Sequence, residues 1–475
     1  MNFIDKRSKL IGTIGPSSEN YETFKQLVLS GLTCVRTNFS HGSHEEQEKK
    51  FLNAKKASKE LNIPISIMLD TKGPEIRLGK MKDGAQLIKA NSEIVLYTTE
   101  QDYQNRIGNE KEWTVSYRMD KDVKKGDKVL FDDGKLLTEV VSVQDGLINL
   151  ITHNQHLLKT NKRINIPGVE FSLPFLSEKD RNDILFGIEQ DVDYIAASFV
   201  NSAKDVKELR EILNSNNGSH IKIISKIESQ TGINNIDAII EHSDGIMIAR
   251  GDLGLEIPYY DVPYHQKRII KKCRAVGKPV IVATQMLDSM EKTPQPTRAE
   301  VTDVYWATEL GADSTMLSGE SASGDFPIEA VKVMSTINMR AEKEIYSSLD
   351  YPIQLKSIWE NSNKDFRNEM AYNIAQKALD GKYKYIVVRS KTGQLLQTIA
   401  KYRPNAAIIG LVEDEKQIKK FGITNSVFVS LDSSKLFKEL KNDFSNAKEA
   451  LKPFYPKSGD KYIVIDNNKE EEFTF

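Results

Sequence analysis

The stretch Ile223-Ile224-Ser225-Lys226-Ile227-Glu228 carries a cation and an anion two positions apart inside an apolar run. The run has the composition of a buried strand, and the side chains of a strand alternate between its two faces. Lys226 and Glu228 therefore point in the same direction. Removing charges from water is costly, so a buried strand seldom carries such a pair without a function. The pair predicts a functional site at the end of this strand.

Seven further short apolar runs alternate with longer segments of helical composition. The eight predicted strands are residues 9–14, 34–39, 65–70, 194–199, 221–228, 245–249, 279–284 and 314–318. The predicted helices between them are residues 22–30, 46–60, 178–190, 203–214, 264–275 and 299–310, and Ser177 is placed to cap the third. Strands that alternate with helices form a parallel sheet, and eight such units form a closed (β/α)₈ TIM barrel.

Most of the predicted strands end in polar or charged residues. These ends are residues 36–40, Asp70, Ser198, Lys226 with Glu228, residues 250–252, Thr284 and Ser318. A barrel of this kind carries its chemistry at the C-terminal ends of its strands. We therefore expect one active site where these ends meet.

The long segment between the third and fourth strands has a different pattern. It contains predicted strands at residues 93–98, 128–131, 136–143 and 147–152, separated by turns at Gly126, Gly134 and Gly146. We predict a small β-barrel inserted on the active face. Two chain crossings tether such a domain, so it is able to move as a lid.

A third pattern begins near residue 346. Strands are predicted at residues 385–389, 406–411, 427–431 and 461–465, with helices at 394–401, 413–421 and 434–444. This alternation indicates a separate open α/β domain. The predicted domains are the barrel in two parts, 1–71 and 171–345, the β-barrel lid at 72–170 and the C-terminal domain at 346–475.

Composition excludes several classes of protein. The 475 residues are 39% hydrophobic and 28% charged with a net charge of −1, which argues against nucleic-acid binding and against an anionic membrane surface. The N-terminal residues lack an apolar signal core, and the chain has no apolar run of transmembrane length. Cys34 and Cys273 are expected to be buried thiols in a reducing compartment. We expect a cytoplasmic protein.

Several strand ends have residues suited to anions and cations. The Arg36 guanidinium presents a fork of donors for phosphate, and Gly251 lets backbone N–H groups approach an anion. Glu228 and Asp252 would form a two-carboxylate Mg²⁺ site completed by substrate and water. The alternatives are a structural ion pair at Lys226 and Glu228, a solvated linker at residues 70–77, and a capped turn at residues 38–40.

Together these motifs resemble pyruvate kinases. The family's patterns are matched in order by residues 13–17, 36–42, 69–77, 224–228, 249–258, 283–287, 296–300 and 316–320, which span the barrel. The resemblance implies the same three-domain fold and a homotetramer. It also implies transfer of the phosphoryl group of phosphoenolpyruvate to ADP, giving ATP and pyruvate, the last step of glycolysis.

The resemblance assigns roles at the reacting centre. Lys226 would stabilise the transferring phosphoryl group, and Glu228 and Asp252 would bind Mg²⁺ (or Mn²⁺). The residues that would hold the substrate are Arg36, Lys226, Gly251, Asp252 and Thr284. The enolate left behind would gain its proton near Thr284 and Ser318.

A K⁺ site and a nucleotide site are implied in the same way. The K⁺ ligands would be Asn38, Ser40, Asp70 and Thr71. The nucleotide would contact Asn38, His41, Arg77 and Lys162. In this family a glutamate at the position of Glu75 goes with K⁺ dependence and a lysine with independence, so we expect activation by K⁺.

The departures from the family pattern concern regulation. Thr37 replaces an aliphatic residue, and Tyr305-Trp306 replaces a small residue and an asparagine, but neither departure falls on a matched catalytic position. In the C-terminal domain, Ser390-Lys391-Thr392-Gly393-Gln394-Leu395 lacks the arginine and final hydroxyl of the family's effector loop. The closing glycine-rich loop is also absent. We expect weak or no activation by fructose 1,6-bisphosphate, and the sequence leaves any other effector open.

Two competing functions use the same residues. A lyase or aldolase that handles enolpyruvates would also use Mg²⁺ and paired carboxylates, but it needs neither the inserted lid nor Arg77. A regulatory relative that binds ligands without turnover would not need Lys226, Glu228, Asp252 and Arg36 to be intact. ADP-dependent formation of pyruvate distinguishes all three.

Overall fold

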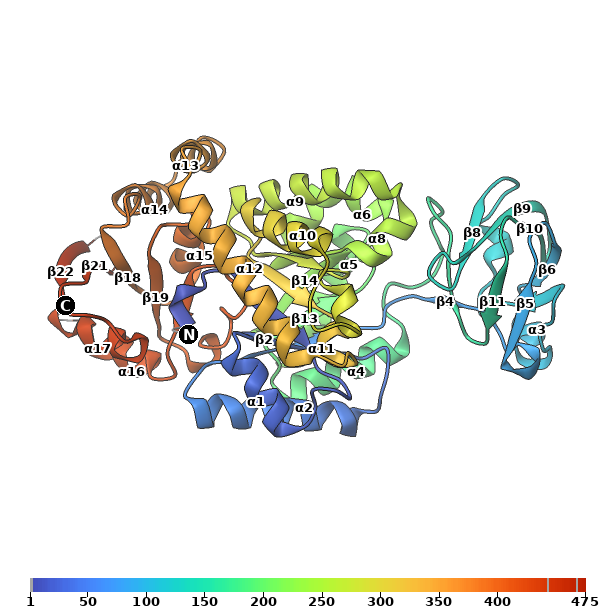
Figure 1. The fold of residues 1–475 in the computed structure, drawn as a ribbon, viewed down its shortest axis with the longest axis horizontal. Helices are drawn as coiled ribbons and strands as arrows, with labels where there is room; N and C mark the ends of the chain where they lie inside the picture. Colours follow the sequence, from blue (N-terminus) through green and yellow to red (C-terminus); the bar gives the residue numbers. More distant parts are fainter. Residues whose placement is uncertain (1–2, 442–443, 467–468) are drawn as a thin grey trace.

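A computed structural model of the chain describes residues 3–441, 444–466 and 469–475. Three bodies lie in a row along its longest axis (Figure 1). The barrel is in the middle, the inserted domain stands on one side of it, and the C-terminal domain packs against the other. Within the described residues, no helix combines the length and the apolar character needed to cross a membrane.

The central body is the predicted (β/α)₈ barrel. Eight parallel strands close in the order β1-β17-β16-β15-β14-β13-β3-β2. Their bounds are β1 (Lys9–Thr13), β2 (Cys34–Asn38), β3 (Ser66–Asp70), β13 (Tyr194–Ala197), β14 (Lys222–Ile227), β15 (Gly245–Ala249), β16 (Val280–Ala283) and β17 (Ser314–Leu317). All eight predicted strands are confirmed. Glu228, Thr284 and Ser318 lie just after their strands rather than within them, where the backbone is free to turn.

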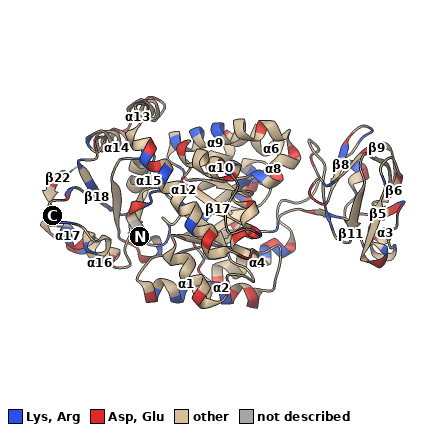
Figure 2. Cartoon of the chain, in the orientation of Figure 1, with Lys and Arg blue, Asp and Glu red and all other residues tan. Residues whose placement is uncertain are grey.

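Helices surround the barrel and bury its outer face. They are α1 (Tyr21–Leu29), α2 (His44–Leu61), α4 (Glu178–Glu189), α5 (Ala203–Ser215), α6 (Gln230–Asn234), α7 (Ile236–His242), α8 (Arg250–Glu256), α9 (Val262–Val276), α10 (Arg298–Glu309), α11 (Gly319–Ala322) and α12 (Pro327–Ser347). Ser177 caps α4 through a capping box with Asp180, as expected. Figure 2 shows that charged residues are distributed along the outer helices.

The barrel interior has its own apolar core. Ile224, Met247, Ile281 and Met316 from neighbouring strands pack there, together with Ile423 from the C-terminal domain. Ile224 and Lys226 are two residues apart in β14 and so share a face. Lys226 therefore stands at the end of this interior column, and it is 7% exposed.

The inserted domain is a β structure between β3 and β13. Seven strands follow the order β4-β12-β8-β9-β10-β6-β7, and β5 pairs with β11 in a separate ribbon. Their bounds are β4 (Ile76–Arg77), β5 (Ala85–Ile88), β6 (Glu93–Tyr97), β7 (Glu112–Thr114), β8 (Lys128–Phe131), β9 (Leu136–Gln144), β10 (Leu147–Thr152), β11 (His156–Lys159) and β12 (Arg163–Asn165), with helix α3 (Glu100–Asn105). Gly79 N–H donates to Thr114 O at 2.8 Å and Ser116 N–H to Arg77 O at 3.0 Å, which joins the two edge strands.

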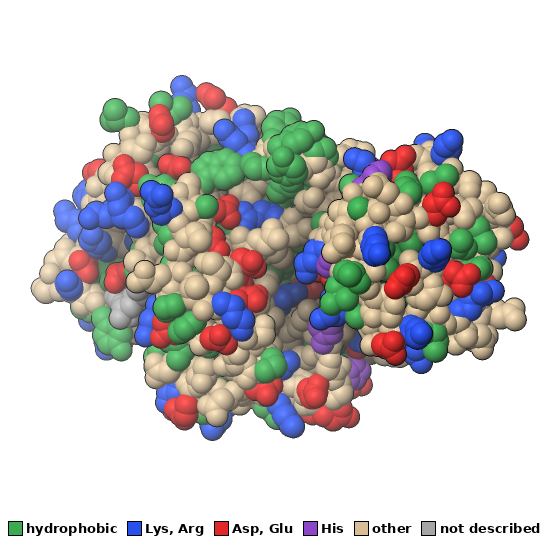
Figure 3. All heavy atoms as spheres, turned by 45° about the vertical axis from the view of Figure 1, so that its right-hand side comes forward, with side chains coloured by type: hydrophobic (Ala, Val, Ile, Leu, Met, Phe, Trp, Pro, Cys, Tyr) green, Lys and Arg blue, Asp and Glu red, His purple; other side chains and the backbone are tan. Residues whose placement is uncertain are grey.

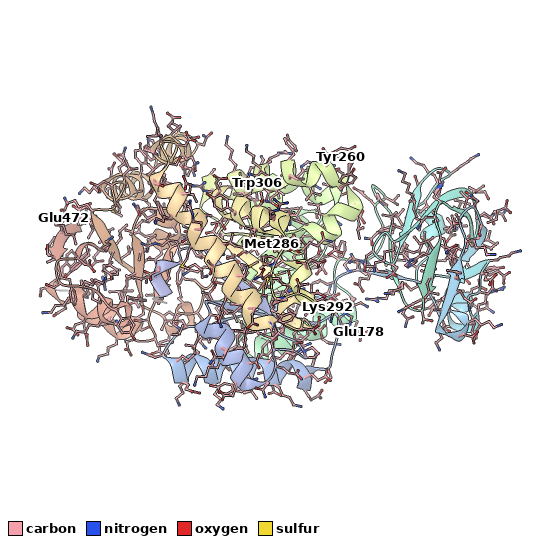
Figure 4. All side chains as sticks on the ribbon, in the orientation of Figure 1. Glu178, Tyr260, Met286, Lys292, Trp306 and Glu472 are labelled. Atoms are coloured by element: carbon pink, nitrogen blue, oxygen red, sulfur yellow. The ribbon has the colours of Figure 1, made fainter. Side chains whose placement is uncertain are left out.

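The C-terminal domain is an open α/β sheet in the order β20-β19-β18-β21-β22. Its strands are β18 (Tyr383–Ser390), β19 (Ala407–Val412), β20 (Val427–Val429), β21 (Lys461–Asp466) and β22 (Lys469–Thr474). Its helices are α13 (Tyr351–Glu360), α14 (Phe366–Lys377), α15 (Gln394–Ala400), α16 (Ser433–Glu439) and α17 (Ala447–Leu451). Glu472, labelled in Figure 4, lies at the end of the molecule farthest from the inserted domain.

Two features of this domain differ from the prediction. The helix predicted at residues 413–421 is wrong, since only the 3₁₀ turn Glu415–Gln417 forms there. Short turn hydrogen bonds, such as Ile418 N–H to Glu415 O at 3.1 Å, replace a helix, and Lys419 O accepts from Ser66 Oγ of the barrel. The prediction also missed β22, which pairs antiparallel with β21 at the sheet edge. The helix predicted at 434–444 ends at Glu439, and residues 442–443 lie outside the described residues.

A buried ion pair joins the C-terminal domain to the barrel. Arg403 donates to Asp313 Oδ2 and to Gly311 O, both at 2.8 Å. Asp313 also accepts the N–H of Val280 at 3.1 Å and that of Asn425 at 3.0 Å. Both charged side chains are less than 10% exposed, at 8% and 4%. One carboxylate therefore connects two barrel strands to the neighbouring domain.

Replacing Arg403 should destabilise this junction. Arg403→Met removes the ion-pair partner of the buried Asp313 carboxylate, which costs about 3–5 kcal/mol of unfolding free energy. The measurement is equilibrium unfolding in urea. The control is Arg340→Met, which removes an exposed arginine 3.1 Å from Glu344 and should cost less than about 1 kcal/mol. Equal effects of the two substitutions would contradict the role given to Arg403.

Candidate active site

Lys226 is the centre of a charged cluster at the C-terminal end of β14. Its Nζ lies 2.9 Å from Asp70 Oδ1, 3.1 Å from Glu228 Oε1 and 2.7 Å from Ser198 Oγ. Burial alone would lower the pKa of Lys226, but the Asp70 and Glu228 carboxylates outweigh it and raise the pKa. The ammonium group is therefore charged and fixed by three neighbours.

Asp70 connects Lys226 to Arg36 of β2. The Arg36 Nε donates to Asp70 Oδ2 at 2.6 Å and its Nη1 to Thr13 Oγ1 at 2.8 Å. Burial would raise the pKa of Asp70, but the charges of Arg36 and Lys226 outweigh it and lower the pKa. Asp70 thus compensates two cations at once.

Glu228 and Asp252 place two more carboxylates beside Lys226. Glu228 is 1% exposed and accepts the N–H of Phe199 at 2.6 Å. Burial raises the pKa of Glu228, and the neighbouring Asp252 raises it further, while Lys226 and Arg163 oppose the shift. Asp252, in the first turn of α8, forms an ion pair with Arg163 of the inserted domain. A further cation beside Glu228 would therefore stabilise the charged form of this carboxylate.

The backbone at Gly251 and Thr284 is held in a fixed arrangement. Gly251 N–H donates to Thr284 Oγ1 at 2.7 Å. Thr284 and Gln285 both have a left-handed backbone, with φ of 69° and 54°. Arg250 supports this turn by donating to Thr284 O at 2.8 Å and to Asp303 at 2.6 Å. Strained residues of this kind concentrate at functional sites.

Ser318 follows β17 on the next strand of the barrel. Its N–H donates to Glu320 Oε2 at 2.7 Å. Its Oγ is buried and has no hydrogen-bond partner among the described residues. Glu320 also accepts the N–H of Leu287 at 3.0 Å, and burial raises its pKa. Ser318 therefore has an unused hydroxyl at the barrel mouth.

The four residues expected to bind K⁺ lie at the ends of β2 and β3. Asn38 and Asp70 are direct neighbours in the paired strands. Asn38 Oδ1 accepts the N–H of Ser40 at 3.0 Å. Thr71 O accepts from Ser198 Oγ at 2.7 Å. The structure thus brings these oxygens to one corner of the barrel mouth.

The four residues expected to contact a nucleotide are divided between the barrel and the inserted domain. Asn38 and His41 line a cleft of about 800 Å³ that also contains Pro16, Lys50 and Asn53. Arg77 instead forms an ion pair with Glu75 at 2.7 Å, and Lys162 lies 2.7 Å from Asp132. Figure 3 shows the hollow between the two bodies, with basic and histidine side chains on its walls.

Sequence reasoning missed three residues of this site. Ser198 was recognised as a polar strand end but given no role, and Thr13 lies at the end of β1. Either could have been found from its position at the barrel mouth. Arg163 could not, because it follows Asn161 and Lys162 in a polar segment typical of an exposed turn.

The comparisons with known proteins agree with this geometry. The family model for the barrel domain of pyruvate kinase matches residues 5–331. Pyruvate kinase of Mycoplasma pneumoniae is 40% identical over 489 residues, covering 96% of both chains. Pyruvate kinase of Geobacillus stearothermophilus is 43% identical over 426 residues, covering 89% of this chain and 71% of that protein.

The solved structures show the same relationship. The crystal structure of a pyruvate kinase from Cryptosporidium parvum has a TM-score of 0.90 and 37% identity, covering 100% of this chain and 97% of the other. The similarity includes all three bodies and is not confined to the barrel. The chain therefore belongs to the pyruvate kinase family and transfers the phosphoryl group of phosphoenolpyruvate to ADP.

Proposed function

We propose that Lys226, Arg36, Glu228 and Asp252 form the phosphoryl-transfer centre of this enzyme. The observation that carries the proposal is the position of Lys226 Nζ, 2.9 Å from Asp70 and 3.1 Å from Glu228 at the barrel mouth. Phosphoryl transfer is catalysed mostly by positioning and by neutralising charge on the moving group. Lys226 supplies a fixed positive charge for that group, and the Arg36 fork holds its oxygens.

Glu228 and Asp252 fit a divalent cation, Mg²⁺ (or Mn²⁺). Both offer hard carboxylate oxygens, and the burial of Glu228 makes its negative charge costly without a cation. Within the described part of the chain, no group of three or more His, Cys, Asp or Glu side chains could hold a metal. The cation would therefore complete its ligands from substrate and water. When bound, it supplies charge neutralisation for the phosphoryl oxygens.

The substrate's carboxylate would lie against the backbone of Gly251 and Asp252 and the hydroxyl of Thr284. The Gly251 N–H to Thr284 Oγ1 contact of 2.7 Å holds these groups in register. Thr284 and Ser318 would deliver the proton that converts the enolate to pyruvate. The unpartnered, buried Ser318 Oγ supports this role, because a bound water or substrate would satisfy it.

The residues at the barrel mouth support the K⁺ and nucleotide assignments. Asn38, Ser40, Asp70 and Thr71 supply neutral and anionic oxygens of the kind that bind K⁺. The cleft beside Asn38 and His41 has the volume for the base and ribose of ADP, about 800 Å³. Arg77 and Lys162 would reach its phosphates after the inserted domain moves and their present ion pairs break.

We also propose a homotetramer that acts in the cytoplasm. Tyr259, Tyr260 and Tyr264 are 80%, 68% and 63% exposed on the barrel surface, an aromatic patch typical of contact with another chain. Tyr260 is labelled in Figure 4 at the outer edge of the barrel. Cys34 and Cys273 are buried free thiols, which are typical of a reducing compartment.

The first test removes the charge of Lys226. Lys226→Met should lower kcat by about 10³-fold, because a preorganised charge in a buried site contributes strongly to the transition state. The measurement is pyruvate formation from phosphoenolpyruvate and ADP in a coupled assay, with circular dichroism to check the fold. The control is Lys222→Met on the same strand, whose Nζ lies 3.1 Å from Asp244 away from the site. Unchanged turnover in Lys226→Met would refute the mechanism.

The second test concerns K⁺. Replacing K⁺ by tetramethylammonium should lower turnover by about tenfold or more, equivalent to about 1.4 kcal/mol in the barrier. Glu75→Lys should make turnover insensitive to the exchange, because the new ammonium group would supply the missing charge. Steady-state kinetics in the two salts measure both effects. Equal wild-type turnover in the two salts would show that the K⁺ assignment is wrong.

The third test concerns fructose 1,6-bisphosphate. The loop after β18 lacks the arginine and the final hydroxyl of the family's effector loop, and Arg389 near the end of β18 is already paired with Asp466 of β21. A sugar bisphosphate would therefore lack the arginine fork that binds phosphate. Adding the sugar should change the half-saturating concentration of phosphoenolpyruvate by less than about twofold, because contacts with exposed charges alone contribute little free energy. A large decrease on adding the sugar would contradict this prediction.

A further inference from the structure

Strand β12 of the inserted domain contacts helix α8 of the barrel. In β12, Arg163 forms an ion pair with Asp252, and Asn165 Nδ2 donates to Glu256 Oε1 at 3.0 Å. Residues two apart in a strand share a face, and residues four apart on a helix share a face. The two contacts therefore run in parallel between β12 and α8. We call this pair of contacts the β12–α8 clasp.

Arg163 pairs with Asp252 and interacts electrostatically with Glu228, the two carboxylates proposed for the divalent cation. Its side chain is 17% exposed and that of Asp252 is 23% exposed. Its guanidinium carbon is 4.8 Å from the centre of the Phe199 ring, and the Phe199 N–H donates to Glu228. Arginine remains charged at any ordinary pH. A permanent cation therefore already occupies the side of Asp252 that faces the inserted domain.

Carboxylates outnumber the cations that the barrel supplies to this cluster. The anions are Asp70, Glu228 and Asp252, and the cations on the barrel are Arg36 and Lys226. Three negative charges against two positive charges leave an excess of one negative charge. Arg163, which the inserted domain supplies, offsets this excess, and Glu75 and Glu256 add further negative charge around it. A divalent cation at Glu228 and Asp252 would bring two positive charges to the same carboxylates.

We propose that Arg163 is a positioning residue that competes with the divalent cation for Asp252. In the metal-free protein it holds the β12–α8 clasp closed, and binding of the cation releases it. This inference rests on the metal site proposed above. Coupling between two ligands is reciprocal. If the clasp weakens binding of the cation by a given factor, the cation weakens the clasp by the same factor. Binding of the metal therefore loosens the contact between the inserted domain and the barrel.

Mn²⁺ binding to the substrate-free enzyme tests the competition directly. The free Mn²⁺ signal in electron paramagnetic resonance gives Kd without any turnover. Arg163→Met should lower the Kd of Mn²⁺ by about tenfold, within the usual range of coupling between two sites. Arg163→Lys keeps a charge at this position and should retain most of the wild-type Kd. The control is Arg106→Met, which removes the same charge from the inserted domain at a residue paired with Asp102, and its Kd should equal that of the wild type.

An unchanged or higher Kd in Arg163→Met, with Arg163→Lys behaving the same, would overturn the inference. Asp252→Asn separates this failure from failure of the metal site. If Asp252→Asn does not weaken Mn²⁺ binding, the metal assignment is wrong. If it does and Arg163→Met has no effect, only the competition is wrong.

The release of the inserted domain has its own readout. The two native cysteines are buried, so spin labels can be placed selectively at Leu52→Cys on the barrel and Ile107→Cys on the inserted domain, which are 54% and 64% exposed. Adding Mg²⁺ should broaden the distance distribution between the labels. Arg163→Met should give the broad distribution without Mg²⁺. A distribution that neither change alters would overturn the coupling to domain movement.

Discussion

The active end of this molecule depends on keeping one ammonium group charged where water is largely excluded. Lys226 is 7% exposed, and such a position would ordinarily favour the neutral amine. Asp70 and Glu228 prevent this, and Asp70 at the same time compensates Arg36. Two neighbouring cations are therefore maintained at a site that must accept an anion. The ends of β2, β3 and β14 have to meet for this to happen, so the closed barrel is a condition of the chemistry.

Much of this arrangement could be predicted from the sequence because each strand is identified by its own short apolar run. Each strand of a barrel ends at the same face, so finding eight strands was enough to bring residues 36–40, Asp70, Lys226 and residues 250–252 together. The apolar runs that identify the strands are also the residues that fill the core. The roles of individual residues came from the family resemblance, and strand positions alone do not give them.

What could not be predicted depends on contacts between distant segments. Residues 413–421 have a helical composition, but the segment forms turns, and its Lys419 carbonyl accepts a hydrogen bond from Ser66 of the barrel. β22 has four consecutive charged residues and forms because it lies at an exposed sheet edge, where charge is tolerated. Arg163 resembles any exposed turn residue until the inserted domain is placed against α8. None of these contacts leaves a periodic pattern in the sequence.

Ile423 has a consequence for how the chain is made. It fills the floor of the barrel, and Ser314 Oγ donates to its carbonyl at 2.9 Å, yet it comes more than a hundred positions after the last barrel strand begins. During synthesis on a ribosome, the eight strands emerge before the residue that closes their interior. The interior of the nascent barrel therefore stays exposed to other apolar chains at this end until the C-terminal domain is synthesised. The inserted β domain has its own core and is fully synthesised before the C-terminal domain. We therefore expect it to be the first part of the nascent chain to fold.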